Sequence, residues 1–242
     1  MRRLLSAAAL LLLLFGCADD RGYFLEGSKE QQRELRLLQQ MLREEPEDSP
    51  QHSVLVQQIA RKLVGVGAPT KMRMFLTEHV QRHQEDPVNG YYLYLVAESY
   101  EGAEAAPVKQ LYLRRLLRNY PDVVVDGSST HLLALQQLVT LVEDPNERVD
   151  YYKELLSRFS EDLDTGELYY RLAEAHEAAG EWKEAYDAYR NFLRYPETRI
   201  PGVPKVHREI RQKLAFYDSG KEWTMDTLDA LVSEIKRAIY LQ

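Results

Sequence analysis

The sequence has 242 residues, enough for one large domain or two small ones. Its 31 Lys and Arg residues against 38 Asp and Glu residues give a net charge of −7, and this acidity argues against a nucleic-acid-binding protein. With 45% hydrophobic and 29% charged residues, the composition is that of an ordinary globular protein. The single cysteine, Cys17, excludes an intramolecular disulfide and a cysteine-based zinc site.

The first 16 residues have the pattern of a signal peptide. The chain opens with the basic residues Arg2 and Arg3, and an apolar run follows from Leu4 to Phe15. This run is too short for a permanent membrane helix, which needs about 20 residues. A basic start followed by a short apolar run is typical of a secretory signal. We therefore expect residues 1–16 to be a signal peptide.

The apolar run ends in Leu14-Phe15-Gly16-Cys17, which resembles the bacterial lipoprotein signal. In that signal, a Leu and a small residue precede a Cys that becomes the lipidated N-terminus. Phe15 departs from the pattern, because a smaller residue is commoner at its position. The resemblance implies a diacylglyceryl and acyl lipid on Cys17, and residues 17–27 are then the lipidated Cys and its tether. The alternative is an ordinary cleaved signal peptide with an incidental Cys.

The residue after the cysteine indicates at which membrane a lipoprotein of this kind is held. In well-studied Gram-negative lipoproteins, an Asp at this position retains the protein at the inner membrane, and here the residue is Ala18. The resemblance therefore implies a protein lipid-anchored to the bacterial cell envelope, at the outer membrane and facing the periplasm.

From Ser28 onward, apolar residues recur with helical spacing, and Pro or Gly interrupts them at intervals. Val123-Val124-Val125 is the one strand-like run, and we interpret it as an extended connector. Helices without a sheet predict an all-α fold, either a solenoid or a bundle. The expected helices cover residues 28–45, 51–65, 70–84, 89–102, 105–119, 129–143, 146–159, 165–179, 182–194, 204–216 and 224–240.

Residues 166–196 contain the clearest repeat pattern and resemble a tetratricopeptide repeat, a helix–turn–helix unit of about 34 residues. Phe192 stands where the family prefers Ala, and Pro196 arrives about one residue early. Ala173 and Ala185 are small, so that two helices can approach closely. The family's signature positions correspond here to Tyr169, Leu172, Ala173 and His176 in the first helix, Gly180 in the turn, Ala185 and Tyr189 in the second helix, and Pro196 at the exit.

A degenerate copy of this pattern lies earlier in the chain, where Val96–Glu101 mirrors Leu172–Glu177. The resemblance implies a right-handed α-solenoid of antiparallel helical hairpins over residues 28–200. Residues 201–242 fit no repeat, and we expect them to form a C-terminal helical cap, because the terminal units of solenoids are atypical.

The sequence carries no catalytic signature. It lacks Gly-x-Gly-x-x-Gly, the Walker loop and Gly-x-Ser-x-Gly, so we expect no enzyme activity and no cofactor besides the lipid. His79 and His83 share a helix face and could chelate a metal. However, Glu78 precedes His79, which is not the zinc-protease order, and Arg82 would repel a cation. We therefore expect a solvated helix end and no metal site.

In the tetratricopeptide family, the first helices of the repeats line a concave groove. By resemblance, this groove would be aromatic and acidic, which suits an extended or helical partner of basic or apolar character. Solvated helix faces are the alternative interpretation. The implied groove residues are Tyr94, Glu98 and Glu101 from one unit and Tyr170, Arg171, Glu174 and Glu177 from another.

These resemblances imply a protein–protein interaction scaffold whose partners are other envelope proteins, with the membrane reached through the lipid and with no nucleic-acid partner. The layout is similar to that of the tetratricopeptide lipoprotein of the outer-membrane barrel assembly machinery. The alternative is a small-ligand-binding or transporter-associated periplasmic lipoprotein.

Overall fold

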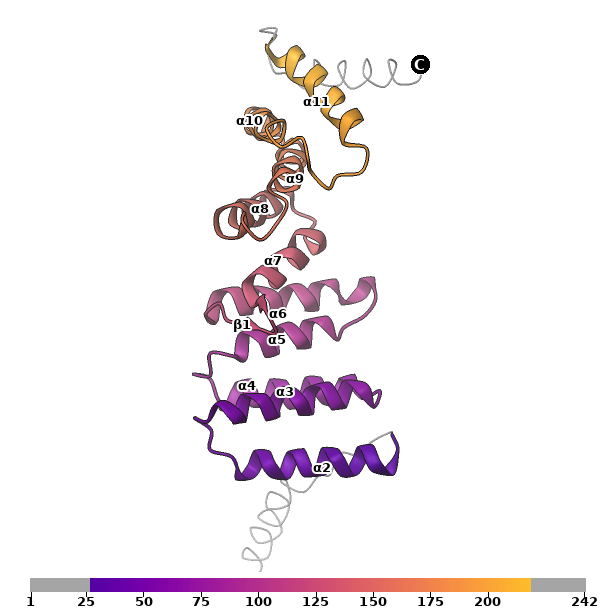
Figure 1. Ribbon diagram of the computed structural model, residues 1–242, viewed down its shortest axis with the longest axis vertical. Coiled ribbons are helices and arrows are strands. Elements are labelled where there is room, and N and C mark those ends of the chain that lie inside the picture. The colour runs from indigo at the N-terminus through magenta and orange to yellow at the C-terminus, as the bar shows by residue number, and fades with distance from the viewer. Residues whose placement is uncertain (1–26, 219–242) are drawn as a thin grey trace, which may run out of the picture. The chain divides into compact units, whose positions relative to one another are not determined.

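The computed structural model describes residues 27–218, and most of them are helical, which confirms the all-α class (Figure 1). This part of the chain contains ten α-helices, one short 3₁₀ helix and one two-stranded ribbon. It divides after Ser99 into two compact units. Cys17 and the expected helix over 224–240 lie outside the described residues.

The first unit is a series of helices that each pack against the next one along the chain. Lys62, near the end of one helix, lies 2.5 Å from Glu34, near the start of the preceding helix, so the two helices run in opposite directions. Large apolar side chains between the helices are fully buried, among them Ile59, Leu76 and Tyr92. The helices are α2 (Lys29–Glu44), α3 (Pro50–Gly65), α4 (Pro69–Arg82) and α5 (Asn89–Glu98).

The second unit continues in the same way, and each of its α-helices packs against its sequence neighbour. One of its core clusters joins α8, α9, α10 and α11 through Val149, Leu172, Tyr189 and Leu214. The elements are η1 (Ala103–Ala105), α6 (Ala106–Asn119), β1 (Val124–Val125), β2 (Ser128–Ser129), α7 (Thr130–Leu141), α8 (Pro145–Phe159), α9 (Thr165–Ala178), α10 (Trp182–Phe192) and α11 (Val203–Asp218).

Several helices begin where short polar side chains cap their free N–H groups. The Ser28 hydroxyl accepts from the Gln31 N–H while the Gln31 side chain accepts from the Ser28 N–H, which forms a capping box on α2. Asp164 caps α9 by accepting from the Glu167 N–H at 2.9 Å. Each cap contributes about 0.5–2 kcal/mol, so these residues fix the helix starts.

The expected extended connector at Val123–Val125 is in fact part of a small ribbon. Strand β1 pairs antiparallel with β2, with Val124 opposite Ser129. The turn between them is Asp126-Gly127, and both residues have positive φ, 52° and 81°. An Asp-Gly dipeptide favours such a two-residue turn, and hydrophobic spacing alone does not reveal it.

The small residues Ala173 and Ala185 and the glycine Gly180 lie at the contact and the turn of the α9–α10 pair. Ala173 and Ala185 are fully buried in the same core cluster. Gly180 has φ of +77°, and the Glu181 N–H returns to the His176 carbonyl at 2.9 Å, so the glycine ends α9 in the left-handed conformation. Small residues therefore lie where two helices meet, and a glycine lies where the chain reverses.

Overpacking this contact should destabilise the protein. Ala185→Leu adds volume where Ala185 has no exposed surface, and we expect a loss of about 1–3 kcal/mol in the free energy of unfolding. Urea denaturation followed by circular dichroism measures it. Ala178→Leu makes the same change on the exposed end of α9 and should leave stability nearly unchanged. Equal stability of the two variants would mean that Ala185 does not face the helix contact.

Candidate functional site

Two of the predicted groove residues lie on α5 in the first unit. Tyr94 is half-buried and stacks on Tyr91, with ring centroids 6.3 Å apart. Glu98 is exposed at the last position of the helix.

Glu101 lies beyond α5, because the helix expected over 89–102 ends at Glu98. The Ser99 hydroxyl donates to the Val96 carbonyl at 2.7 Å, and Gly102 has φ of +83°. A side chain that bonds the local backbone and a left-handed glycine both compete with continuation of a helix. Glu101 therefore does not share a helix face with Tyr94 and Glu98, and it belongs to the second unit.

A concave site of about 640 Å³ lies within the second unit, between α7, α8 and α9. We call it the α7–α9 cleft. Its apolar lining includes Val139, Leu155 and Leu168, which are buried core residues, and the half-buried Leu163. Its polar lining comprises Gln136, Thr140, Arg148, Tyr152, Asp164, Glu167, Arg171 and Glu174.

Arg171 is the centre of the charged lining. Its Nη1 lies 2.9 Å from Glu174 Oε2 and its Nε 3.7 Å from Glu167 Oε1. About 40% of each of these side chains is exposed, so the ion pairs contribute little stability and remain accessible to a partner. Burial would lower the pKa of Arg171, but the hydrogen bond to Glu174 and the negative charges of Glu174 and Glu167 together outweigh it, so the pKa is raised and this side chain is a permanent cation.

Arg148 and Tyr152 bring α8 into the cleft, and the sequence pattern did not single them out. Arg148 Nη2 donates to the Val142 carbonyl at 2.5 Å, while its buried Nε has no hydrogen-bond partner among the described residues. Burial raises the pKa of the Tyr152 hydroxyl, which keeps it protonated and able to donate. The cleft thus offers hydrogen-bond donors above an apolar lining.

Tyr170 lies on a different side of α9 from Arg171, since successive residues of a helix point about 100° apart. Its ring packs against Phe192 and Tyr189 of α10, with centroid distances of 5.3 and 6.2 Å. Burial, followed by the nearby Glu174 carboxylate, raises the pKa of Tyr170 to about 12. Tyr170 is therefore part of the contact between α9 and α10.

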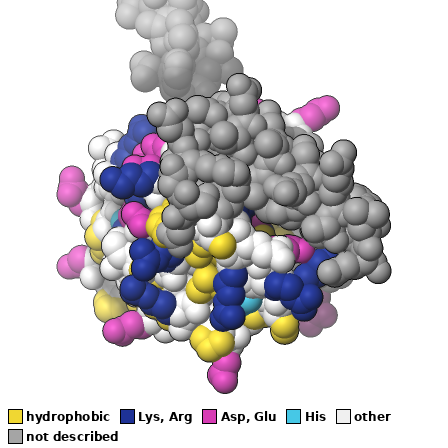
Figure 2. Space-filling view, turned by 90° about the horizontal axis from the view of Figure 1, so that it is seen from above, with side chains coloured by type: hydrophobic (Ala, Val, Ile, Leu, Met, Phe, Trp, Pro, Cys, Tyr) yellow, Lys and Arg dark blue, Asp and Glu magenta, His cyan; other side chains and the backbone are white. Residues whose placement is uncertain are grey.

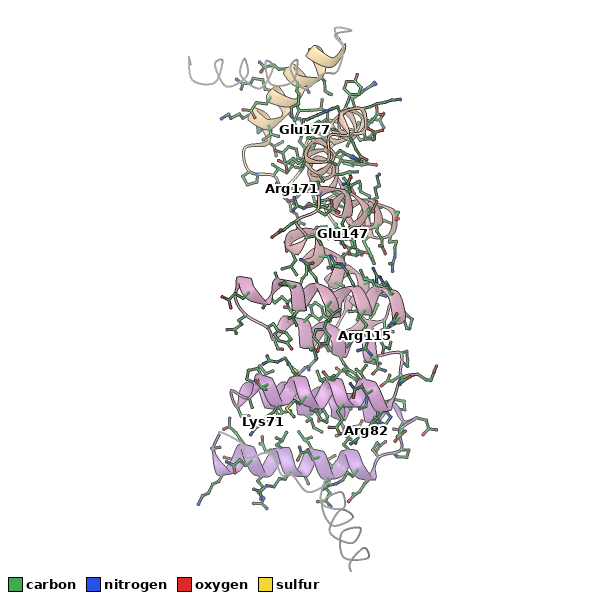
Figure 3. The ribbon with its side chains drawn as sticks, turned by 180° about the vertical axis from the view of Figure 1, so that it is seen from behind. Lys71, Arg82, Arg115, Glu147, Arg171 and Glu177 are labelled. Atoms are coloured by element: carbon green, nitrogen blue, oxygen red, sulfur yellow. The ribbon has the colours of Figure 1, made fainter. Side chains whose placement is uncertain are left out.

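Glu177 also serves an internal contact. It accepts a hydrogen bond from the Tyr189 hydroxyl at 2.9 Å and pairs with Lys213 Nζ of α11. Figure 3 labels both Glu177 and Arg171, which lie on the same helix, α9. Of the predicted groove residues on α9, the structure thus brings Arg171 and Glu174 into the cleft, whereas Tyr170 and Glu177 contact α10 and α11.

Helix α11 presents a different surface. Its Arg208 and Arg211 line a shallow pocket together with His207, whose pKa is lowered by burial and by the neighbouring Arg211. On the face that Figure 2 shows, Lys and Arg side chains lie among hydrophobic ones. The described part of this face is therefore mixed in character.

A third group of polar side chains lies in the first unit. His52, His79 and His83 approach one another there, with His52 and His79 buried. The sequence pattern indicated the pair on α4 but gave no sign of His52, because only the packing of α3 on α4 brings it close.

No protein-family model matches this chain, and no curated protein sequence matches it significantly. Across residues 27–218, none of the helices combines the length and the apolar character needed to cross a membrane.

Proposed function

We propose that this protein is a lipid-anchored envelope scaffold, not an enzyme, that binds a segment of another envelope protein in the α7–α9 cleft. Residues 28–200 would form a right-handed solenoid of tetratricopeptide-like hairpins, and residues 201–242 its C-terminal cap. The observation that carries the proposal is the cleft itself, an open surface with apolar, aromatic and charged lining.

The anchor part of the proposal rests on the sequence. The signal-like segment ends at Cys17, the only cysteine, which would carry the lipid. Ala18 after it favours the outer membrane, with the folded part facing the periplasm.

The scaffold part rests on how successive helices pack. Each described α-helix of the second unit packs on the next, and stacks of helix pairs generate extended concave surfaces that bind partners. The α7–α9 cleft lies beside α9, the first helix of the segment that resembles the repeat. A cleft with an apolar lining and flanking Tyr and Arg side chains matches the residue types that concentrate binding energy.

The charges suggest what the cleft binds. Asp164, Glu167 and Glu174 outnumber the cations Arg148 and Arg171 along its lining. This balance favours a partner segment with basic residues at its edges and an apolar side chain that contacts the half-buried Leu163 of the lining.

Reversing two of the acidic charges tests the proposal. We expect Glu167→Lys combined with Glu174→Lys to reduce co-purification of the main partner from detergent-solubilised membranes by at least about tenfold, since like charges brought together cost several kcal/mol. Quantitative mass spectrometry of the captured proteins measures this. Helical content and the thermal midpoint should stay close to wild type, because these ion pairs are exposed.

The matched control is Glu184→Lys combined with Asp187→Lys, which makes the same charge change at exposed positions of α10. This variant should retain the partner. Wild-type partner levels in the Glu167/Glu174 variant would contradict binding in the cleft and direct attention to α11. Loss of a co-purifying small molecule from that variant would instead favour a small-ligand function.

A further inference from the structure

Three histidines converge at one end of the α3–α4 pair. His52 lies in the first turn of α3, His79 in the last turn of α4, and His83 at the C-cap of α4. One ring nitrogen of each lies within 4.8 Å of the others. The ring centroids of His79 and His83 are 4.4 Å apart, and each is 5.5 Å from that of His52.

His52, one of the two buried histidines of the cluster, lacks hydrogen-bond partners among the described residues. Both ring nitrogens of His52 are buried and make no hydrogen bond among the described residues. An imidazole carries a donor and an acceptor, and buried polar groups are as a rule paired. The ring nitrogens of His52 are therefore available to bind a metal ion, because no polar group of the described residues pairs with them.

The other two rings each face a carboxylate. His79 Nε2 lies 3.5 Å from Asp86 Oδ2, and His83 Nδ1 lies 3.2 Å from Glu47 Oε2. The Val88 N–H donates to the other oxygen of Asp86 at 2.9 Å and holds this carboxylate in place. Metal-bound histidines commonly use their second ring nitrogen in this way, which orients the ring and raises its basicity.

We propose that His52, His79 and His83 bind a divalent transition-metal ion, with Zn²⁺ the preferred one. Imidazole nitrogens suit Zn²⁺, Cu²⁺ and Ni²⁺, whereas Mg²⁺ and Ca²⁺ require oxygen ligands. Tetrahedral Zn²⁺ with Zn–N bonds of about 2.0–2.1 Å places its ligand nitrogens about 3.4 Å apart, so ring nitrogens that now lie within 4.8 Å of one another need to approach by at most about 1.4 Å. The fourth position is left for water or a carboxylate.

The nearby arginine does not oppose this site, contrary to the sequence-based expectation. Arg82 Nη2 pairs with Glu78 Oε1 at 2.5 Å, and its side chain is 64% exposed (Figure 3). The positive charge of Arg82 is therefore paired with Glu78 and surrounded by solvent, which weakens its repulsion of a bound cation. In addition, His79 and His83 lie at the C-terminal end of α4, where the helix dipole favours a cation.

The ion would connect the start of α3 with the end of α4 and thereby stabilise the first unit. This inference does not depend on the α7–α9 cleft, which lies in the other unit. The proposed role of the ion is to hold α3 and α4 in a fixed relative position through ligands from both helices.

Zinc titration tests the proposal. The probe is ZnCl₂ added to the untagged full-length chain in detergent, with Cys17→Ser in every variant so that no thiol binds zinc. Competition with a chromogenic chelator should show one Zn²⁺ per chain, and saturating zinc should raise the thermal midpoint. His83→Gln should weaken binding by at least about tenfold and abolish the thermal shift.

His207→Gln is the matched control, because His207 also has a buried ring nitrogen without a partner, on α11 in the second unit. It should bind zinc like wild type. No zinc uptake, or equal affinity in the His83 and His207 variants, would overturn the site. X-ray absorption of the zinc-loaded parent chain does not depend on how the His83 variant folds: three imidazole ligands support the proposal, and fewer than three contradict it.

Discussion

Replacing Cys17 with Ser will move the protein from the membrane fraction to the soluble fraction or leave it as an unprocessed precursor. Lipid attachment is the whole of the proposed anchor, since each buried methylene contributes about 0.8 kcal/mol and only several acyl chains together hold a protein stably. Fractionation of cells with and without detergent measures the change. Mass spectrometry of the wild-type mature N-terminus should show a diacyl-modified Cys17 as its first residue.

The control for this experiment is Ala18→Ser, which changes the next residue and keeps the thiol. It should remain in the membrane fraction. A mature wild-type protein that begins elsewhere without lipid, or a processed Cys17→Ser protein that stays with the membranes, would contradict the anchor.

Much of the helical layout could be predicted from the sequence because its signals are local. The helix expected over 165–179 is observed as Thr165–Ala178, with the Asp164 cap before it and Gly180 after it. The ribbon around Asp126-Gly127 and the early end of α5 were missed. Both depend on turn chemistry, which hydrophobic periodicity does not register.

The candidate site was less predictable because it depends on contacts between helices. Arg171 and Glu174 could be placed on an exposed helix face from their spacing alone. Arg148 and Tyr152 enter the cleft only through the packing of α8 on α9. His52 is a similar case, since it lies near His79 and His83 only because of how α3 packs against α4.

Phe192 departs from the repeat pattern, and the structure supplies a physical reason. Its ring is fully buried and packs edge-to-face with the His207 ring of α11, with centroids 4.6 Å apart and planes at 83°. It also packs against Tyr170 of α9. A large ring therefore fills space between the α9–α10 pair and α11, where an alanine would leave a gap.

Truncating this ring should accordingly be among the most damaging single changes in the second unit. Phe192→Ala removes the transfer energy of the ring and leaves a cavity, so we expect a loss of about 3–5 kcal/mol in the free energy of unfolding. Urea denaturation measures this loss, and limited proteolysis between α10 and α11 should accelerate as α11 loses its contact. Phe192→Leu keeps most of the volume and should cost less than about 1.5 kcal/mol. A Phe192→Ala variant as stable as Phe192→Leu would mean that the ring does not pack among these three helices.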